Sequence, residues 1–253
     1  VLVFYHAEEE RRSVIEKNRN HAASIVELIV SHQQKLIEET RVYLMKLAGH
    51  AQVQDPTSPA CSEYLADILR LSSVYVNLGV PTTDGDLLCS ASPLATPINV
   101  GDRGYFQRTI QNRVFSIGEF QTDRAASMVS MNFSYPVVSG RGKLVGAVVA
   151  VISLDWWSEE LTKAKLPGKA IAIIADAEGN IVANFPPRTE QLGRSVNHYI
   201  DNANGDQDRL VRGEDGIQRV FFSAPLYTTS AGRSVSISIG MPVGEEITAA
   251  NQA

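Results

Sequence analysis

The sequence predicts an α+β fold in which one long helix precedes two similar units, each a mainly antiparallel sheet flanked by helices. Three observations predict this fold. Residues 6–51 contain no proline, and no glycine before Gly49, and they repeat apolar side chains at helical spacing. Short strand patterns separated by glycine-containing turns follow. These strand patterns occur twice in the same order. The chain has 253 residues, 44% of them hydrophobic, which is enough for two modest cores.

The long helix occupies most of the first segment, residues 1–51. Its apolar positions form one stripe, namely Val14, Ile15, Ala22, Ile25, Val26, Ile29, Leu36, Ile37, Leu44 and Leu47. A helix this long exceeds what one small domain covers. We therefore expect its first half to pair with a second subunit, giving a homodimer, and its second half to pack on the sheet that follows. The alternative is a helix packed wholly within its own monomer.

The chain starts with the apolar residues 1–5 and then becomes strongly charged. No stretch approaches the ~18–20 apolar residues that span a bilayer. We interpret the apolar start as the end of a transmembrane helix, so that the full-length protein is membrane-anchored. An ordinary helix or strand start is the alternative.

Residues 52–154 form the first predicted unit. Pro56 and Pro59 end the long helix, because proline lacks the N–H donor and restricts the residue before it. The expected elements are a short helix at 62–71, a hairpin of strands 74–78 and 87–90, and two long strands at 128–138 and 144–154 joined by a tight turn. The last strand is apolar on both faces, which predicts a central strand.

Residues 155–242 form the second predicted unit, and 243–253 are expected to begin a helix towards a second membrane span. The expected elements are a helix at 155–164, strands at 170–175 and 181–185, a short helix near 195–202, and strands at 209–212, 218–224 and 234–241. Gly85 matches Gly179, an offset of 179 − 85 = 94, and Pro136 matches Pro225, an offset of 225 − 136 = 89. Two nearly equal offsets in the same order indicate a duplicated unit.

The candidate binding site is the turn at residues 101–108, which places Arg103, Tyr105 and Phe106 at the start of a helix. An arginine at a helix N-terminus adds its N–H donors to the exposed backbone N–H groups, and carboxylates match such a set of donors. The aromatic residues supply apolar walls and one hydroxyl. Alternatively, Arg103 bonds a nearby carbonyl or Asp102, and Phe106 or Tyr105 belongs to the core.

Four further residues are candidates for the same site. Gln121 and Asp123 lie on a short strand and loop, where they are expected to form a polar rim, with Asp123 accepting from an ammonium or hydroxyl group. A solvated loop is the alternative. Ser130 and Asn132 share the polar face of strand 128–138, which faces either water or a wet pocket.

Several functional classes are excluded or disfavoured. The net charge of −5, with basic residues scattered among acids, argues against a nucleic-acid partner. The sequence contains no serine-hydrolase, zinc-protease or phosphate-loop motif, so we do not expect an enzyme. Five histidines without metal spacing predict no metal and no cofactor. Cys61 and Cys89 are far enough apart to pair, but they lie in no recognised pattern, and we expect two unpaired thiols.

The motifs together resemble a known family. They are Asp102-Arg103-Gly104-Tyr105-Phe106-Gln107-Arg108, Tyr135-Pro136-Val137-Val138, Gly142-Lys143-Leu144-Val145-Gly146 and Ile152-Ser153-Leu154-Asp155. They are similar to double Cache sensor domains, the PDC-like extracytoplasmic domains of bacterial histidine kinases, diguanylate cyclases and chemoreceptors. The resemblance covers nearly the whole chain. It implies two PDC/PAS-like units in a periplasmic sensor domain without enzymatic activity, with a small-molecule pocket in the membrane-distal unit, residues 52–154.

The resemblance also implies residue roles. Arg103 takes the place of the arginine that holds a ligand carboxylate, Tyr105 and Phe106 match the aromatic pair, and Asp123 lies near the polar loop position. In amino-acid-binding members an acidic residue on the last distal strand holds the ligand amine, and here Val151 matches it. This difference favours a simple carboxylate or another small polar molecule. The alternative function is a ligand-free interaction module of the same fold.

Overall fold

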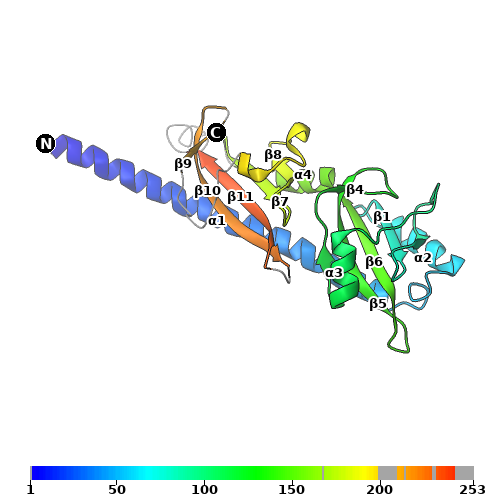
Figure 1. Ribbon diagram of the computed structural model, residues 1–253. Helices are drawn as coiled ribbons and strands as arrows, with labels where there is room; N and C mark the ends of the chain where they lie inside the picture. Colours follow the sequence, from blue (N-terminus) through cyan, green and yellow to red (C-terminus); the bar gives the residue numbers. More distant parts are fainter. Residues whose placement is uncertain (1, 167, 199–209, 214, 230–231, 243–253) are drawn as a thin grey trace.

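One long helix runs alongside two antiparallel sheets that follow one another along its length (Figure 1). The structure, a computed structural model, describes residues 2–166, 168–198, 210–213, 215–229 and 232–242. Helix α1 (Leu2–Ala48) contacts strands β5 and β6 of the first sheet and strands β10 and β11 of the second. Because it touches both sheets, α1 is the common support of the two units.

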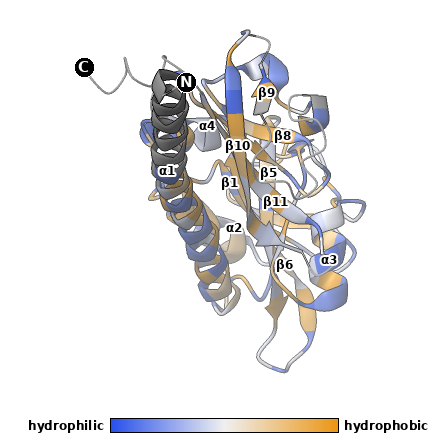
Figure 2. Cartoon of the chain, turned by 90° about the vertical axis from the view of Figure 1, so that its left-hand side faces the viewer, coloured by the Kyte–Doolittle hydropathy of each residue, from blue (hydrophilic) through white to orange (hydrophobic). Residues whose placement is uncertain are grey.

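The first sheet has the strand order β2-β1-β6-β5-β3, with β4 also pairing with β5. The elements are α2 (Pro59–Leu69), β1 (Asn77–Pro81), β2 (Leu87–Ser90), α3 (Gly104–Asn112), β3 (Ser116–Ile117), β4 (Gln121–Thr122), β5 (Val129–Val138) and β6 (Leu144–Ser153). Strand β6 is central and buried, as predicted. Helix α2 begins earlier than expected because the Ser58 hydroxyl accepts from the Ala60 N–H at 3.4 Å and Pro59 occupies the first turn. Figure 2 shows α1 and α3 on opposite sides of the strands.

The second sheet has the order β8-β7-β11-β10-β9. Its elements are α4 (Leu154–Lys163), β7 (Ile171–Ala175), β8 (Ile181–Phe185), the 3-10 turns η1 (Thr189–Gln191) and η2 (Val196–His198), β9 (Leu210–Arg212), β10 (Gln218–Thr228) and β11 (Ser234–Pro242). The helix expected near 195–202 is represented by η2, and residues 199–202 lie outside the described residues. The helix expected at 243–253 also lies outside them.

The duplication is visible in the strand register. In the first sheet Val151 pairs with Asn77 on one side and Asn132 on the other. In the second sheet Gly240 pairs with Ile171 and Phe221 in the same way. The offsets are 171 − 77 = 94 and 221 − 132 = 89, which are the two values seen in the sequence. Strands β1, β6 and β5 of the first sheet therefore correspond to β7, β11 and β10 of the second.

The second half of α1 packs on the sheets, as predicted. Its buried side chains are Val26, Ile29, Gln33, Ile37, Thr40, Leu44, Leu47 and Ala48. On the same helix, Leu28 is 71% exposed and Met45 is 41% exposed. Pairing with a second subunit remains a prediction. None of the described helices is long and apolar enough to cross a membrane.

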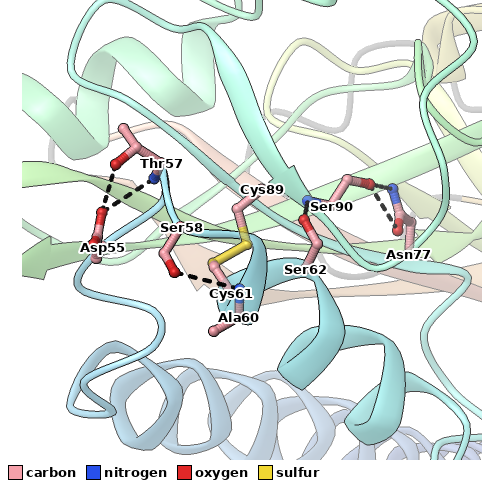
Figure 3. Close-up of a disulfide and its surroundings, with 9 residues drawn as sticks. All are labelled: Asp55, Thr57, Ser58, Ala60, Cys61, Ser62, Asn77, Cys89 and Ser90. Atoms are coloured by element: carbon pink, nitrogen blue, oxygen red, sulfur yellow. Dashed lines mark hydrogen bonds between the residues drawn. A yellow bond between two sulfur atoms is a disulfide. The ribbon is translucent and has the colours of Figure 1, made fainter.

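The expectation of two unpaired thiols is wrong. Cys61 and Cys89 form a disulfide, with their Cα atoms 5.8 Å apart, which links α2 to β2 (Figure 3). Beside it, the Ser90 N–H donates to the Ser62 hydroxyl at 3.2 Å and strengthens the same contact. The two cysteines meet because α2 packs on β2, and no local sequence pattern predicts that packing.

The two units touch through the segment 115–120 of the first. The N–H of Phe120 donates to Oδ2 of the buried Asp176 at 2.8 Å. The Tyr227 hydroxyl donates to the Phe115 carbonyl at 3.0 Å, and the two rings meet edge to face at 5.7 Å. A side chain at Gly193 would lie 2.7 Å from the Phe120 ring. The contact is therefore close and specific rather than a loose linker.

Candidate functional site

Arg103 lies immediately before α3, in extended backbone. Its Nη2 donates to the Thr122 carbonyl at 3.1 Å, so the bond to a nearby carbonyl is one role it fills. Asp102 instead forms a two-pronged ion pair with Arg124, with both N–O distances 2.7 Å. Arg103 is half-buried as a residue, and the Thr122 bond uses one of its five N–H donors. Further donors are available to an anion at this end of α3.

Four predicted site residues form one buried hydrogen-bond network. Asn132 donates through Nδ2 to the Tyr105 hydroxyl at 3.2 Å and to Oδ2 of Asp123 at 2.9 Å. Ser130 donates through its hydroxyl to Oδ1 of Asn132 at 2.9 Å. All four side chains are buried. The polar face of β5 thus lies inside the protein and not against bulk water, because α3 and the loop after it cover it.

Asp123 is also the anchor of its loop. Its Oδ1 accepts from the backbone N–H groups of Ala125 and Ala126 at 2.9 and 2.7 Å, while Oδ2 points to Asn132. With 8% of its surface exposed, Asp123 is not part of a solvated loop. The turn orients a carboxylate oxygen towards Tyr105 and Asn132.

The Tyr105 hydroxyl stays protonated at neutral pH. Burial raises its pKa to about 12; the Asn132 hydrogen bond lowers it, the Asp123 charge raises it, and Arg103 and Gln121 lower it. Arg103 donates to the Thr122 carbonyl beside Asp123, and Gln121 pairs with Ser130 between β4 and β5. Five of the seven predicted residues therefore surround Tyr105 or include it, and they combine one cation, one carboxylate, a phenol and two amides, with Ser130 behind Asn132.

Phe106 packs in the same apolar cluster as Tyr105, together with Val100, Ala147 and Val149, which corresponds to the core role considered as its alternative. Two further residues of the site carry no signal in the sequence. A Cβ atom at Gly118 would lie 2.9 Å from the Tyr105 ring, and the Thr109 hydroxyl bonds Ser134 beneath the network. Ser134 could have been predicted, because it lies on the same polar face of β5 as Ser130 and Asn132.

Val151 lies between two amides on the face of the sheet opposite α1. Its pairing partners are Asn77 and Asn132. Asn77 donates to the Ser90 hydroxyl at 3.2 Å, and its Oδ1 accepts from the Ser92 N–H at 3.1 Å. This row therefore offers amides and an apolar side chain but no acid. Within the described parts of the chain, no group of three or more His, Cys, Asp or Glu side chains could hold a metal ion.

A family model described as a Cache domain matches residues 7–245. The chain belongs to the Cache family. Cache domains are extracellular sensor domains of membrane receptors, and double Cache domains are ligand-binding modules without enzymatic activity. Signal transduction is thus the general role of this Cache domain. No curated protein matches the chain.

Solved structures share the fold at low identity. The ligand-binding domain of the Pseudomonas fluorescens chemoreceptor CtaA, in complex with L-leucine, is 17% identical with a TM-score of 0.73, covering 93% of this chain and 98% of that one. The corresponding domain of the Pseudomonas aeruginosa chemoreceptor PctB, in complex with L-Arg, is 18% identical with a TM-score of 0.69, covering 88% and 87%. The sensor domain of the Vibrio cholerae histidine kinase DctB is 13% identical with a TM-score of 0.69, covering 89% and 97%.

Proposed function

We propose that this Cache domain is the periplasmic sensor of a membrane-anchored receptor, a histidine kinase, diguanylate cyclase or chemoreceptor. We further propose that its first unit binds a small carboxylate or a similar polar molecule. The observation that carries the proposal is the convergence of Arg103, Tyr105 and Asp123 at the start of α3. A cation, a neutral hydroxyl and a carboxylate within one partly buried site are suited to a small polar ligand.

Each proposed site residue has a chemical role. Arg103 binds the ligand carboxylate through its remaining N–H donors, assisted by the N-terminus of α3. The Tyr105 hydroxyl donates a hydrogen bond to the ligand or accepts one from it, and Gln121 adds an amide at the rim.

Asp123 accepts a hydrogen bond from a ligand hydroxyl or ammonium group through Oδ2, which Asn132 already orients. Ser130 holds Asn132 in place, and Phe106 supports the site from the apolar side.

The choice of a simple carboxylate over an amino acid depends on Val151. The CtaA and PctB domains were solved with amino acids, which supports a ligand site in this fold. An amine needs a nearby anion, and the Asp123 carboxylate has one oxygen already committed to its own loop. Val151 on the central strand β6 adds no second carboxylate, so an ammonium group would have only Oδ2 of Asp123 as its anionic partner, and a simple carboxylate suits the site better.

Signalling would proceed through a homodimer formed by α1. The exposed Leu28 and Met45 on α1 support a partner surface there. A ligand changes the output only if it binds one of two arrangements of the helices more tightly than the other.

The test is a thermal-shift and calorimetry panel of organic acids and amino acids. It uses the unchanged domain, Arg103→Ala, and Arg141→Ala as a matched control in the exposed turn between β5 and β6. A ligand at 100 times its Kd stabilises the fold by about 2.7 kcal/mol. We expect a carboxylate to bind about 10 to 100 times more weakly to Arg103→Ala, and unchanged to Arg141→Ala. Retained affinity in Arg103→Ala would contradict the proposed site.

A second candidate function is a ligand-free interaction module. The observation that favours it is that Tyr105, Asn132 and Asp123 satisfy one another without a ligand. If no compound of a broad panel binds the folded domain, this second function is the better one.

A further inference from the structure

The second unit contains a cavity of about 110 Å³ on the sheet face that points away from α1. Ile171, Ile173 and Phe221 form its floor, and Arg188, Arg212 and Arg219 lie around it. Residues at the neighbouring, alternate positions, such as Ile174 and Ile239, belong to the core shared with α1, which places the cavity on the opposite face. The cavity therefore occupies the position in the second unit that the Tyr105 network occupies in the first.

We propose that this cavity is a second binding site, for a small organic anion with an apolar body. The proposal does not depend on the function proposed for the first unit. It follows from the lining residues of the second sheet and from their counterparts in the first.

The floor of the cavity is apolar because the duplicated row has changed. Asn77, Val151 and Asn132 of the first sheet correspond to Ile171, Gly240 and Phe221 of the second. A Cβ atom at position 240 would lie 2.7 Å from Cζ of the Phe221 ring, so the glycine makes room for that ring. The row thus forms a flat hydrocarbon surface suited to an alkyl or aromatic group.

The described residues around the cavity carry a net positive charge. Among them are three arginines and one acidic residue, Asp215. Arg219, which is 2% exposed, is neutralised by Asp215 through bonds of 2.9 and 2.6 Å, and it also donates to the Lys169 carbonyl at 2.9 and 2.8 Å. The excess charge therefore comes from Arg188 and Arg212 at the exposed rim. Guanidinium groups prefer carboxylates and other planar anions.

One wall of the cavity is held in place by hydrogen bonds. Asn184 at the end of β8 accepts from the Arg188 N–H at 2.8 Å, and its Nδ2 donates to the Arg188 carbonyl at 3.0 Å and to the Gln191 side chain at 3.1 Å. Since Asn184 is buried, these bonds fix the backbone that carries Arg188. A preformed wall reduces the ordering cost of binding.

The experiment is a fluorine NMR titration with para-fluorobenzoate and trifluorobutyrate, two anions with apolar bodies of different shape. It uses the whole domain and five variants: Arg188→Glu, Arg212→Glu, Val211→Trp, which fills the cavity, Arg103→Ala in the first unit, and Arg194→Glu. Arg194 is the matched control, because it is an exposed arginine of the same unit that does not line the cavity. Thermal melts verify that each variant is folded.

We expect saturable binding of at least one probe to the unchanged domain, to Arg103→Ala and to Arg194→Glu. Binding should weaken about tenfold or more in Arg188→Glu and Arg212→Glu and be lost in Val211→Trp. The absence of saturable binding by both probes would overturn the proposal. So would binding that is lost only in Arg103→Ala, because the probe would then occupy the first unit, and so would equal affinity in every folded variant.

Discussion

The two sheets have the same strand order and register but present different chemistry on one face. In the first sheet that face carries Ser130 and Asn132, within a network that includes Tyr105. In the second sheet the same positions are Arg219 and Phe221.

The face towards α1 does not diverge in this way. Leu78 and Ala172 are counterparts there, as are Ala150 and Ile239, and all four are buried and apolar. Packing against a common helix therefore keeps the side chains on one face of each duplicated sheet apolar. The other face is free to specialise, because it covers a site rather than the main core.

The largest expected effect concerns the disulfide, which ties together the first unit alone. The double variant Cys61→Ala/Cys89→Ala should lose about 3–4 kcal/mol of unfolding free energy, since the bridge closes a loop with a sequence separation of 28. Chemical denaturation of the double variant and the unchanged domain measures this difference in unfolding free energy. Reductant should lower the midpoint of the unchanged domain and leave that of the double variant where it is. An unchanged midpoint in both would show that the bridge does not form.

The equivalent residues Asn132 and Phe221 offer a direct comparison of the two sites. Asn132→Leu should cost about 2–3 kcal/mol, because Asp123 and Ser130 lose a buried hydrogen-bond partner. Phe221→Leu should cost about 1–2 kcal/mol, because it only enlarges an existing cavity. Unfolding free energies from denaturation measure both. A neutral Asn132→Leu would contradict the buried network.

The contact between the units predicts a smaller effect. Tyr227→Phe removes the hydrogen bond to the Phe115 carbonyl while keeping the packed ring, and it should cost about 1 kcal/mol. Tyr64→Phe is the matched control, since the Tyr64 hydroxyl makes no hydrogen bond among the described residues, and it should stay within about 0.5 kcal/mol of the unchanged domain. Equal melting temperatures for the two variants would argue against the contact.

The smallest expected effect is a pH dependence in the second unit. Hydrogen bonds from Arg219 lower the pKa of Asp215 to about 2. The folded pKa lies below the unfolded value of about 3.9, so this stabilisation is present above that value and is lost as the pH falls from about 4 to about 2. The Asp215 side chain is 35% exposed, so solvent screening keeps the effect small. Asp215→Asn should show a shallower loss of stability in acid melts, and an identical slope would contradict the ion pair.

Much of the fold was predictable because it depends on local patterns. The apolar stripe of α1, the alternation along β5 and the continuous apolar run of β6 each follow from side-chain periodicity. The site was predictable in part. Arg103 and Tyr105 were marked by their place at a helix start, and Asn132 by strand phase, but the packing of Phe106 against the sheet depends on which side of α3 faces the strands.

The sequence by itself determined the order of elements, the duplication with its two offsets, and the residue types that belong to the Cache family. Only the tertiary structure decided which distant residues meet. It joined Cys61 to Cys89, buried Asp123 beside Asn132, bonded Arg219 to the Lys169 carbonyl, and joined the units at Phe120. The physical reason is that side-chain periodicity predicts which face of a helix or strand is buried. The partner that covers that face is decided by tertiary packing, which no local pattern predicts.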